Sequence, residues 1–252
     1  MSLRVALFIM RSVYVGQFSS ISGISCALNS MDQSKEAINQ EAYATSKWLE
    51  RQMYFYELSL KGNSPRFTNL SLLCALSEVT QVVDVGGGSG WVKNLLPKDI
   101  NYRNLELVAT AQYFRKKLNV EDFFVENVQE VEKSSHTILY SNSTIQYFLD
   151  QTKFDEIVSS IDAEMILFDD LYFTESTGFY SLQRYYEWHI PTYFIEKQSL
   201  IQRMKKNGYN LTLEIDYPAS HSKEMLMQIE ITKTEFISID QPKTMVFKKR
   251  KD

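Results

Sequence analysis

The sequence has few cysteines and prolines and lacks a long apolar run. There are 2 cysteines and 5 prolines among 252 residues. Two cysteines cannot form a disulfide framework, and Cys26 and Cys74 do not have the spacing of metal ligands, so we interpret both as reduced thiols and expect no metal site. No segment approaches the roughly 20 apolar residues of a membrane-spanning helix. The first residues, "MSLRVALFIMRS", have neither the apolar length nor the cleavage site of a signal peptide, so we expect a cytoplasmic protein.

The sequence also has no excess of basic residues. Lys and Arg number 27 against 31 Asp and Glu, which gives a formal charge of −4. Because proteins that bind nucleic acid usually concentrate Lys and Arg on one face, we expect no nucleic-acid partner. Hydrophobic residues make up 44% of the chain, as in an ordinary globular protein. The length is sufficient for one large α/β domain with an appendage.

The N-terminal third is predicted to be helical. Residues 38–60 carry aromatic and aliphatic side chains at helical spacing, with neither Pro nor Gly, and "KGNSP" then ends the helix. A second short helix is expected at about 69–78. We interpret residues 1–78 as an N-terminal helical cap region ahead of the main domain.

From Val79 onward, strand-like segments alternate with helical ones. "VTQVVDV" is a continuous apolar run, typical of a central parallel strand that is buried on both faces. "NLELVAT", "DFFVEN", "HTILYSN" and "AEMILFDD" follow at intervals long enough for crossover helices. This pattern predicts an α/β domain over 79–252, with a doubly wound, Rossmann-like parallel sheet. After a helix near 197–207, the segments "YNLTLEIDY", "EMLMQIEITKTEF" and "KTMVFKKR" predict antiparallel strands at the end of the chain.

One short stretch, "VVDVGGGSGWV", holds four of the 9 glycines within five positions. A sharp turn from strand to helix needs positive φ, and glycine also lets the backbone approach a ligand closely. An acid before the turn suits a cationic ligand, and amides at a helix start can bind polar groups. The stretch resembles the D/E-x-G-x-G-x-G motif of S-adenosylmethionine-dependent methyltransferases. That resemblance implies a cofactor site made by Asp84, Gly86, Gly87, Gly88 and Gly90.

Two other interpretations of the glycine stretch stay open. The dinucleotide-binding fingerprint G-x-G-x-x-G, read from Gly86, would need a glycine at residue 91, which is Trp91. Tyr193 and Lys197 have the spacing of a short-chain dehydrogenase pair, but that family has its glycine loop near the N-terminus. The stretch could also be a tight turn that binds no ligand. We favour the methyltransferase over the nicotinamide-dependent oxidoreductase.

Several further segments resemble one bacterial methyltransferase family that is often encoded among surface-polysaccharide genes. They are "YVGQFSS", "HTILYSNSTIQYF", "MILFDDLYF", "YSLQRYYEWHIPTYFI" and "KKNGYNLTLEID", which together span most of the chain. The resemblance implies the class I methyltransferase fold, with a seven-stranded, mostly parallel sheet. It also implies methyl transfer from S-adenosylmethionine to an oxygen, or a nitrogen, of a small or sugar-linked acceptor in surface-polysaccharide metabolism.

One position departs from that family's pattern. The end of the second strand usually carries an acid whose two oxygens bind the ribose hydroxyls of the cofactor. Alignment of "LELVATAQYF" puts Ala109 at this position, with Glu106 earlier in the strand. Thr110 or Gln112 would then hold the ribose through a weaker, neutral hydrogen bond. A catalytically inactive or repurposed binding protein is therefore the alternative function.

Other site residues are expected after later strands, because ligands of open α/β sheets bind beyond the carboxyl ends of the strands. Glu126 and Asn127 are placed at the adenine. Asn142 and Ser143 resemble a polar pair of the family, or else form a turn that caps the next helix. Asp169 and Asp170 end a strand, where one of them is a candidate base or acceptor ligand.

His189 is the histidine in the segment that is expected to cover the acceptor. Since histidine titrates near neutrality, it is a candidate base together with Asp169, although many methyltransferases work by alignment alone. The aromatic residues of 168–194 either line an acceptor pocket or bury the helical cap. The sequence leaves open whether the chain forms a homodimer.

Overall fold

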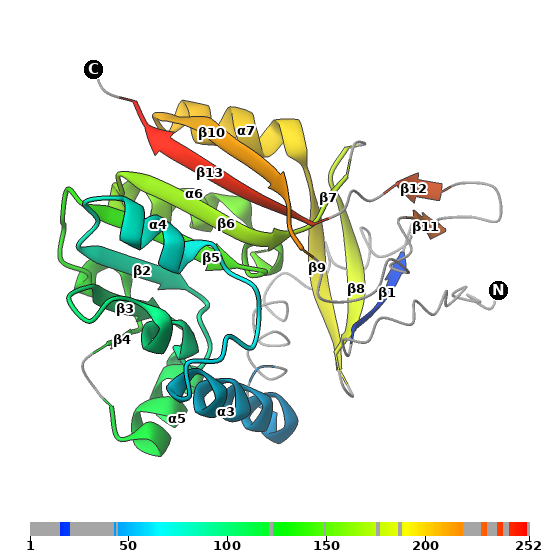
Figure 1. The fold of residues 1–252 in the computed structure, drawn as a ribbon. Coiled ribbons are helices and arrows are strands. Elements are labelled where there is room, and N and C mark those ends of the chain that lie inside the picture. The colour runs from blue at the N-terminus through cyan, green and yellow to red at the C-terminus, as the bar shows by residue number, and fades with distance from the viewer. Residues whose placement is uncertain are drawn as a thin grey trace.

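The structure is a computed structural model (Figure 1). It describes residues 16–20, 43, 45–120, 123–148, 150–174, 177–185, 188–218, 228–230, 236–238 and 242–250. For 16–20, 180–185, 188–189, 228–230 and 236–238, the description covers the backbone only.

The main sheet has seven strands in the order β10-β13-β6-β5-β2-β3-β4. Neighbouring strands from β4 through β3, β2 and β5 to β6 pair in parallel, whereas β13 is antiparallel to both β6 and β10. The strands are β2 (Gln81–Val85), β3 (Asn101–Leu105), β4 (Phe124–Val125), β5 (Thr137–Asn142), β6 (Met165–Leu171), β10 (Tyr209–Asp216) and β13 (Lys243–Lys249). The predicted fold class, with an antiparallel strand near the C-terminus, is confirmed.

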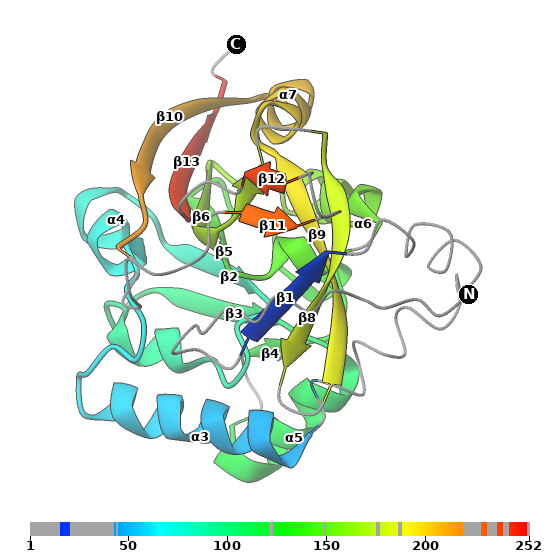
Figure 2. The same cartoon turned by 90° about the vertical axis from the view of Figure 1, so that its right-hand side faces the viewer.

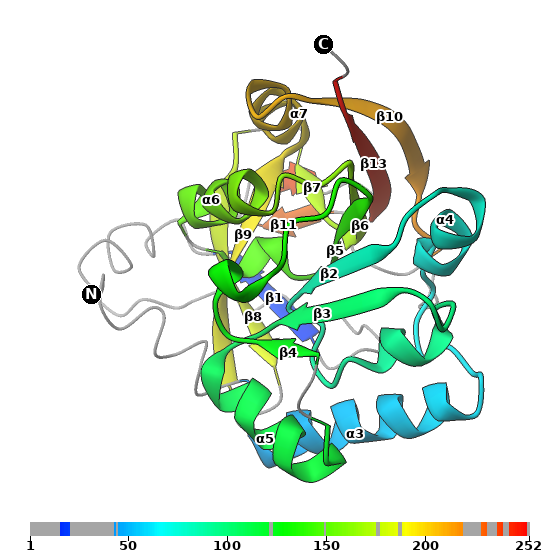
Figure 3. The same ribbon diagram turned by 90° about the vertical axis from the view of Figure 1, so that its left-hand side faces the viewer.

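Helices cover both faces of this sheet (Figure 3). Side chains of α3 (Ser46–Leu60), α4 (Leu70–Leu76) and α5 (Val108–Leu118) share a hydrophobic cluster with Val82 of β2. Side chains of α6 (Gln151–Ile161) and α7 (Lys197–Lys206) share another with Val83. Successive residues of a strand point to opposite faces, so the continuous apolar run of β2 is explained by burial on both.

The two helices predicted within 1–78 are present as α3 and α4. Trp48 of α3 and Leu70 of α4 lie in the same hydrophobic cluster as strand residues of the main sheet. In the described part of the chain these helices thus form a layer on the sheet. The boundary at residue 78 stays a prediction.

The expected α-helix after the glycine stretch is absent from the described residues 86–100. A 3-10 helix, η1 (Trp91–Leu95), takes its place and packs against α3. Pro97 explains the short element, because proline lacks an amide donor and disfavours a helical conformation for the residue before it. Leu96 is accordingly extended, with ψ 155°. Two other 3-10 helices are η2 (Val128–Glu130) and η3 (Ile145–Tyr147).

A second sheet faces the carboxyl ends of the central strands (Figures 1 and 2). Its strand order is β1-β8-β9-β7. The strands are β1 (Gly16–Ser20), β7 (Phe173–Thr174), β8 (Phe179–Tyr185) and β9 (Trp188–Glu196). Most of the aromatic segment 168–194 therefore belongs to a β-hairpin and the short strand before it. β11 (Gln228–Glu230) and β12 (Phe236–Ser238) pair only with each other, so the segment "EMLMQIEITKTEF" adds no described strand to the main sheet.

No helix in the described ranges is long and apolar enough to cross a membrane.

Candidate functional site

The glycine stretch forms a loop at the carboxyl end of β2. Gly86, Gly88 and Gly90 have φ of 73°, 60° and 70°, in the left-handed region that favours glycine. A Cβ atom at Gly87 would collide with the Asp84 carboxylate and the Asn104 side chain. The loop therefore needs glycine for its conformation and for its packing on the strands beneath it.

The amides of this loop already have partners within the chain. Gly87 N–H donates to Asn104 Oδ1 at 3.1 Å, and Gly88 N–H donates to Glu106 Oε1 at 2.8 Å. The amides of Gly86, Ser89 and Gly90 donate to Leu105 O, Gln52 Oε1 and Gly87 O. The expected α-helix does not begin at these amides, because the 3-10 helix η1 follows the loop. Their contact with a cofactor stays a prediction.

Asp84 lies beneath the loop. Its side chain is 1% exposed, and one carboxylate oxygen accepts a hydrogen bond of 2.6 Å from the Tyr102 hydroxyl. Burial raises the pKa of Asp84 to about 7, although the Tyr102 hydrogen bond acts in the opposite direction. At this depth Asp84 can influence a ligand through its charge or by holding the loop.

An acid does follow the second strand of the parallel sheet. β3 ends at Leu105, and Glu106 comes next, with its carboxylate against the loop at Gly88. Its other oxygen accepts a hydrogen bond of 2.8 Å from Leu107 N–H. Burial raises the pKa of Glu106 to about 7, with a smaller contribution from Asp84. The expectation that this position lacks an acid is thus wrong.

The error came from the predicted length of the strand. "NLELVAT" was expected to be extended as far as Thr110, but α5 begins at Val108. Thr110 is 2% exposed and is buried with Ala111 and Phe114 on one side of that helix. Thr110 is therefore buried in α5, and its contact with the ribose stays a prediction.

The residues predicted at the adenine follow the edge strand β4. Glu126 forms an ion pair with Arg115 of α5, whose guanidinium also donates to Phe124 O at 2.7 Å. The side chain of Asn127 accepts a hydrogen bond of 3.2 Å from Gln129 N–H and caps η2. Both side chains thus have local partners, and their contact with adenine stays a prediction.

The polar pair after β5 lies beside the loop. Asn142 Nδ2 donates to the Tyr140 hydroxyl at 3.0 Å, and Asn142 Oδ1 accepts a long contact of 3.5 Å from Arg66. Ser143 has a positive φ of 54°, and its hydroxyl accepts a hydrogen bond of 3.1 Å from Gln146. Asn142 is the last residue of β5 and Ser143 follows it, and a role of the pair in binding stays a prediction.

Thr144 is a residue of the site that the sequence analysis missed. Its hydroxyl donates to Asn142 O at 3.0 Å and lies 3.5 Å from Gly86 O. A Cβ atom at Gly86 would collide with the Thr144 side chain. Thr144 therefore joins the turn after β5 to the glycine loop, which no sequence motif indicated.

Asp169 is a buried carboxylate with several hydrogen-bond donors around it. Its side chain is 0% exposed, and its oxygens are surrounded by hydrogen-bond donors. The donors are the Thr244 hydroxyl at 2.6 Å, the Thr68 hydroxyl at 3.1 Å, the Asn69 amide at 3.2 Å, the Asn69 side chain at 3.3 Å and the Tyr140 hydroxyl at 3.4 Å. Asp169 ties the segment before α4 to β6 and β13, and its catalytic role stays a prediction.

Asp170 and His189 are the remaining residues that the sequence analysis considered for the site. Burial raises the pKa of Asp170 to about 6, and the nearby Arg66 charge lowers it. The backbone of His189 lies in β9, but its side chain is outside the described residues, so its role stays a prediction. His136 is exposed and lies 3.6 Å from Glu164, at the opposite end of β5 from Asn142.

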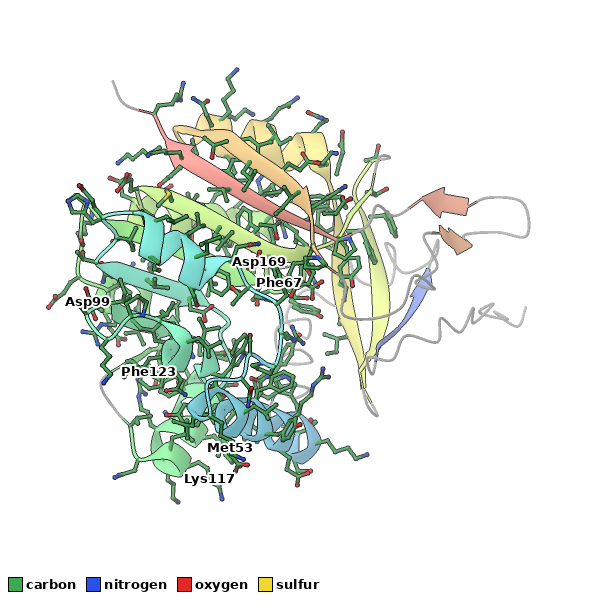
Figure 4. The ribbon with its side chains drawn as sticks, viewed as in Figure 1. Met53, Phe67, Asp99, Lys117, Phe123 and Asp169 are labelled. Carbon is green, nitrogen blue, oxygen red and sulfur yellow. The ribbon has the colours of Figure 1, made fainter. Side chains whose placement is uncertain are left out.

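Two carboxyl groups, those of the buried Asp169 and the half-buried Asp170, lie near the carboxyl end of β6. The segment between α3 and α4, which contains Arg66 and Phe67, reaches Asp169 through the Thr68 hydroxyl, which donates to it at 3.1 Å (Figure 4). Arg66 is the cation that lowers the pKa of Asp170 there, and Asp169 raises it. Within the described residues, no group of three or more His, Cys, Asp or Glu side chains is arranged to hold a metal ion.

Comparison with known proteins adds evidence on the fold. No family model and no curated sequence matches the chain. Among solved structures, 1,6-didemethyltoxoflavin-N1-methyltransferase of Burkholderia thailandensis, with bound 1,6-didemethyltoxoflavin and S-adenosylhomocysteine, is similar with a TM-score of 0.52 at 11% identity, over 95% of this chain and 99% of that one. Streptomyces venezuelae DesVI is similar with a TM-score of 0.51 at 10% identity, over 77% of this chain and 92% of that one. The chain therefore has the class I fold of S-adenosylmethionine-dependent methyltransferases.

Proposed function

We propose that the protein transfers a methyl group from S-adenosylmethionine to an acceptor. The observation that carries the proposal is the junction of the glycine loop with Glu106. The acid that follows the second strand of the sheet contacts Gly88 through a hydrogen bond of 2.8 Å. In the class I fold, the glycine loop and an acid at this strand end hold the ribose part of the cofactor. Here the loop and the acid are in direct contact.

The residues present fit this cofactor. Glu106 offers two carboxylate oxygens to the ribose hydroxyls, in exchange for its present amide donors. Asp84 and Asp170 add negative electrostatic potential at the carboxyl ends of the strands, which favours binding of a sulfonium cation. The cofactor supplies an electrophilic methyl group on its sulfonium sulfur. The protein's part is to align an acceptor atom with that methyl carbon and to exclude water.

We propose a hydroxyl oxygen of a small or sugar-linked molecule as the acceptor. The resemblance of the sequence to methyltransferases of surface-polysaccharide gene clusters supports this class. Tyr172 and Phe179 belong to the segment that faces the carboxyl ends of the strands, and rings of this kind pack well on sugar faces. A nitrogen acceptor is the alternative, since the similar Burkholderia thailandensis enzyme is an N1-methyltransferase.

A second candidate function is a binding protein that keeps the fold without catalysis. The observation that favours it is the satisfied glycine loop, whose amides from Gly86 to Gly90 all donate within the chain. The 3-10 helix η1 replaces the α-helix whose N-terminus would offer free amides. To use the Gly88 or Ser89 amide, a ligand would have to displace Glu106 or Gln52.

Calorimetric titration with S-adenosylmethionine, S-adenosylhomocysteine and NAD tests the proposal. We expect both sulfur ligands to bind and NAD not to bind. Release of S-adenosylhomocysteine with methyl glycosides or phenols as acceptor probes would separate the enzyme from the binding protein. Absence of binding by both sulfur ligands would contradict the proposal.

A further inference from the structure

The order of strands in the main sheet reverses between β2 and β5. From β2 the chain moves outward to β3 and β4, and it then returns to β5 and β6 on the other side of β2. Ligands of open α/β sheets bind at such a point, outside the carboxyl ends of the strands. The glycine loop follows β2 and residues 143–147 follow β5, so these two segments flank the position of a ligand.

The segment after β5 is held by contacts on three sides. Ser143 N–H donates to Asp169 O of β6 at 3.0 Å. The Thr144 hydroxyl lies 3.5 Å from Gly86 O of the glycine loop. The next residues form η3, which packs against β9, a strand of the second sheet that faces the carboxyl ends of the central strands (Figure 1). Residues 143–147 therefore lie between the glycine loop, β6 and β9.

Gln146 of η3 is buried in this place with one polar atom unpaired. The residue is 4% exposed, and its Nε2 donates to the Ser143 hydroxyl at 3.1 Å. Its carbonyl oxygen Oε1 is buried and has no hydrogen-bond partner among the described residues. Since buried polar groups nearly always have a partner, an unpaired carbonyl oxygen at the ligand-binding end of a sheet indicates a ligand that brings a hydrogen-bond donor.

Two comparable residues lie elsewhere in the sheet. Gln81 and Ser141 also have a buried side-chain atom without a partner in the described part of the chain. Gln81 begins β2, at the amino end of the strand, where its Oε1 accepts a hydrogen bond of 2.9 Å from the Thr137 hydroxyl. Ser141 lies within β5, opposite Phe168 of β6. Of these three residues, Gln146 is the one beyond a carboxyl strand end.

We propose that Gln146 selects the acceptor of the methyl group, by accepting at Oε1 a hydrogen bond from a hydroxyl or N–H group next to the atom that is methylated. This inference rests on the proposed function and narrows its substrate class. The acceptor carries a second donor beside the reacting atom, as a vicinal diol does. A carboxamide takes no proton in the reaction, so Gln146 acts by orienting the acceptor toward the methyl carbon.

The cofactor brings a donor of its own, the ammonium group of its methionine part. With adenine at β4 and ribose at Glu106 after β3, the methionine part reaches across the glycine loop toward β5. Thr144 is the residue of the turn that contacts this loop, whereas η3 packs against β9. An ammonium group also forms its strongest hydrogen bonds with a charged acceptor, and the Gln146 carbonyl is neutral. Both points favour the acceptor as the partner of Oε1.

The first test needs no ligand. An unpaired buried acceptor does not stabilise the folded chain, so Gln146→Met should leave the urea midpoint unchanged or raise it. The half-buried Ser143 hydroxyl, which loses its donor, can bond water instead.

Gln151→Met is the matched control. Gln151 Oε1 accepts a hydrogen bond of 2.9 Å from Arg203, and its Nε2 donates to Ile145 O at 3.1 Å, so its urea midpoint should fall. An equal fall in Gln146→Met would mean that Oε1 is paired within the folded chain, and would overturn the proposal.

The second test separates the acceptor from the cofactor. S-adenosylhomocysteine carries the ammonium group, and its affinity for Gln146→Met, measured by calorimetry, should stay within about twofold of the wild type. A loss of about tenfold or more would assign Oε1 to the cofactor and overturn the proposal. Absence of binding in the wild type itself would contradict the proposed function, and is thus distinguished from a failure of this inference alone.

The third test is turnover with catechol, which has two adjacent hydroxyls, and phenol, which has one. We expect the wild type to favour catechol by about tenfold in kcat/KM. Gln146→Met should reduce this preference to about twofold or less, by raising KM for catechol, whereas Gln151→Met should keep it. A preference that Gln146→Met leaves unchanged, or equal use of both probes by the wild type, overturns the proposal. Cofactor binding without turnover of catechol or of the methyl glycosides overturns the substrate class.

Discussion

The Glu106 carboxylate and the Gly88 amide are joined by a hydrogen bond of 2.8 Å. This bond joins the glycine loop to the strand-end acid. A ribose that binds Glu106 must replace the Gly88 amide as donor. Loop and acid are therefore expected to respond together to a cofactor.

Glu106→Gln is expected to weaken S-adenosylmethionine binding by about tenfold or more, because a hydrogen bond to a charged group contributes about 1.5–3 kcal/mol. Calorimetry measures the change. Thr110→Val is expected to leave the affinity unchanged, since Thr110 is buried in α5. Glu132→Gln, at an exposed residue, is the matched control for the chemical change. If Thr110→Val weakened binding and Glu106→Gln did not, the ribose assignment would be wrong.

The sequence predicted those parts of the fold that depend on burial and on glycine. The apolar run of β2 and the positive-φ glycines at 86, 88 and 90 are both present. The sequence predicts a strand that extends to Thr110, which places Glu106 inside the strand. In the structure β3 ends at Leu105, so Glu106 lies just beyond the strand end. Periodicity does not fix such boundaries.

The difference between Asp169 and Asp170 was also beyond sequence reasoning. It depends on Thr68 and Asn69, which are about 100 residues before Asp169 in the chain, and on Thr244, which is 75 residues after it. The donors that fill Asp169 come together only in the folded chain. Similarly, the glycine motif predicts an α-helix, whereas Pro97 limits the element before it to the 3-10 helix η1.

Replacement of the two aspartates is expected to affect stability very differently. Asp169→Asn puts an amide donor against the donors of Thr68, Asn69 and Thr244, and should lower the free energy of unfolding by roughly 2 kcal/mol or more. Asp170→Asn loses no hydrogen bond, and asparagine tolerates the positive φ of 55° at this position. Its effect should be below about 1 kcal/mol. Urea denaturation of the two variants compares them, and equal losses would contradict this difference between the two environments.

Stability is expected to fall as pH rises from about 4 to 7. Asp84 and Glu106 have pKa values raised to about 7 by burial, so the folded chain holds protons that the unfolded chain has already released. The stabilisation from these two carboxyl groups is complete at a pH below their pKa in the unfolded chain. It is lost as pH rises through their pKa in the folded chain. Asp84→Asn should reduce the slope by up to about 1.4 kcal/mol per pH unit, whereas Asp99→Asn, at an exposed residue, should not. Urea midpoints across this range measure the slope, and an unchanged slope in Asp84→Asn would refute the assignment.

Two glycines with similar φ separate backbone strain from packing. Gly208 has φ 90° and open space around its missing Cβ, whereas a Cβ at Gly90, with φ 70°, would lie 2.5 Å from the Phe123 ring. Phe123 is 1% exposed, with its ring centroid 4.4 Å from that of Phe124, so it cannot move aside cheaply. Gly208→Ala should cost about 1–2 kcal/mol, from strain alone. Gly90→Ala should cost about 1–3 kcal/mol more and weaken S-adenosylhomocysteine binding, because the loop must shift. Denaturant unfolding and calorimetry check both variants. Equal costs, or unchanged binding in Gly90→Ala, would mean that the loop is not held in shape by Phe123.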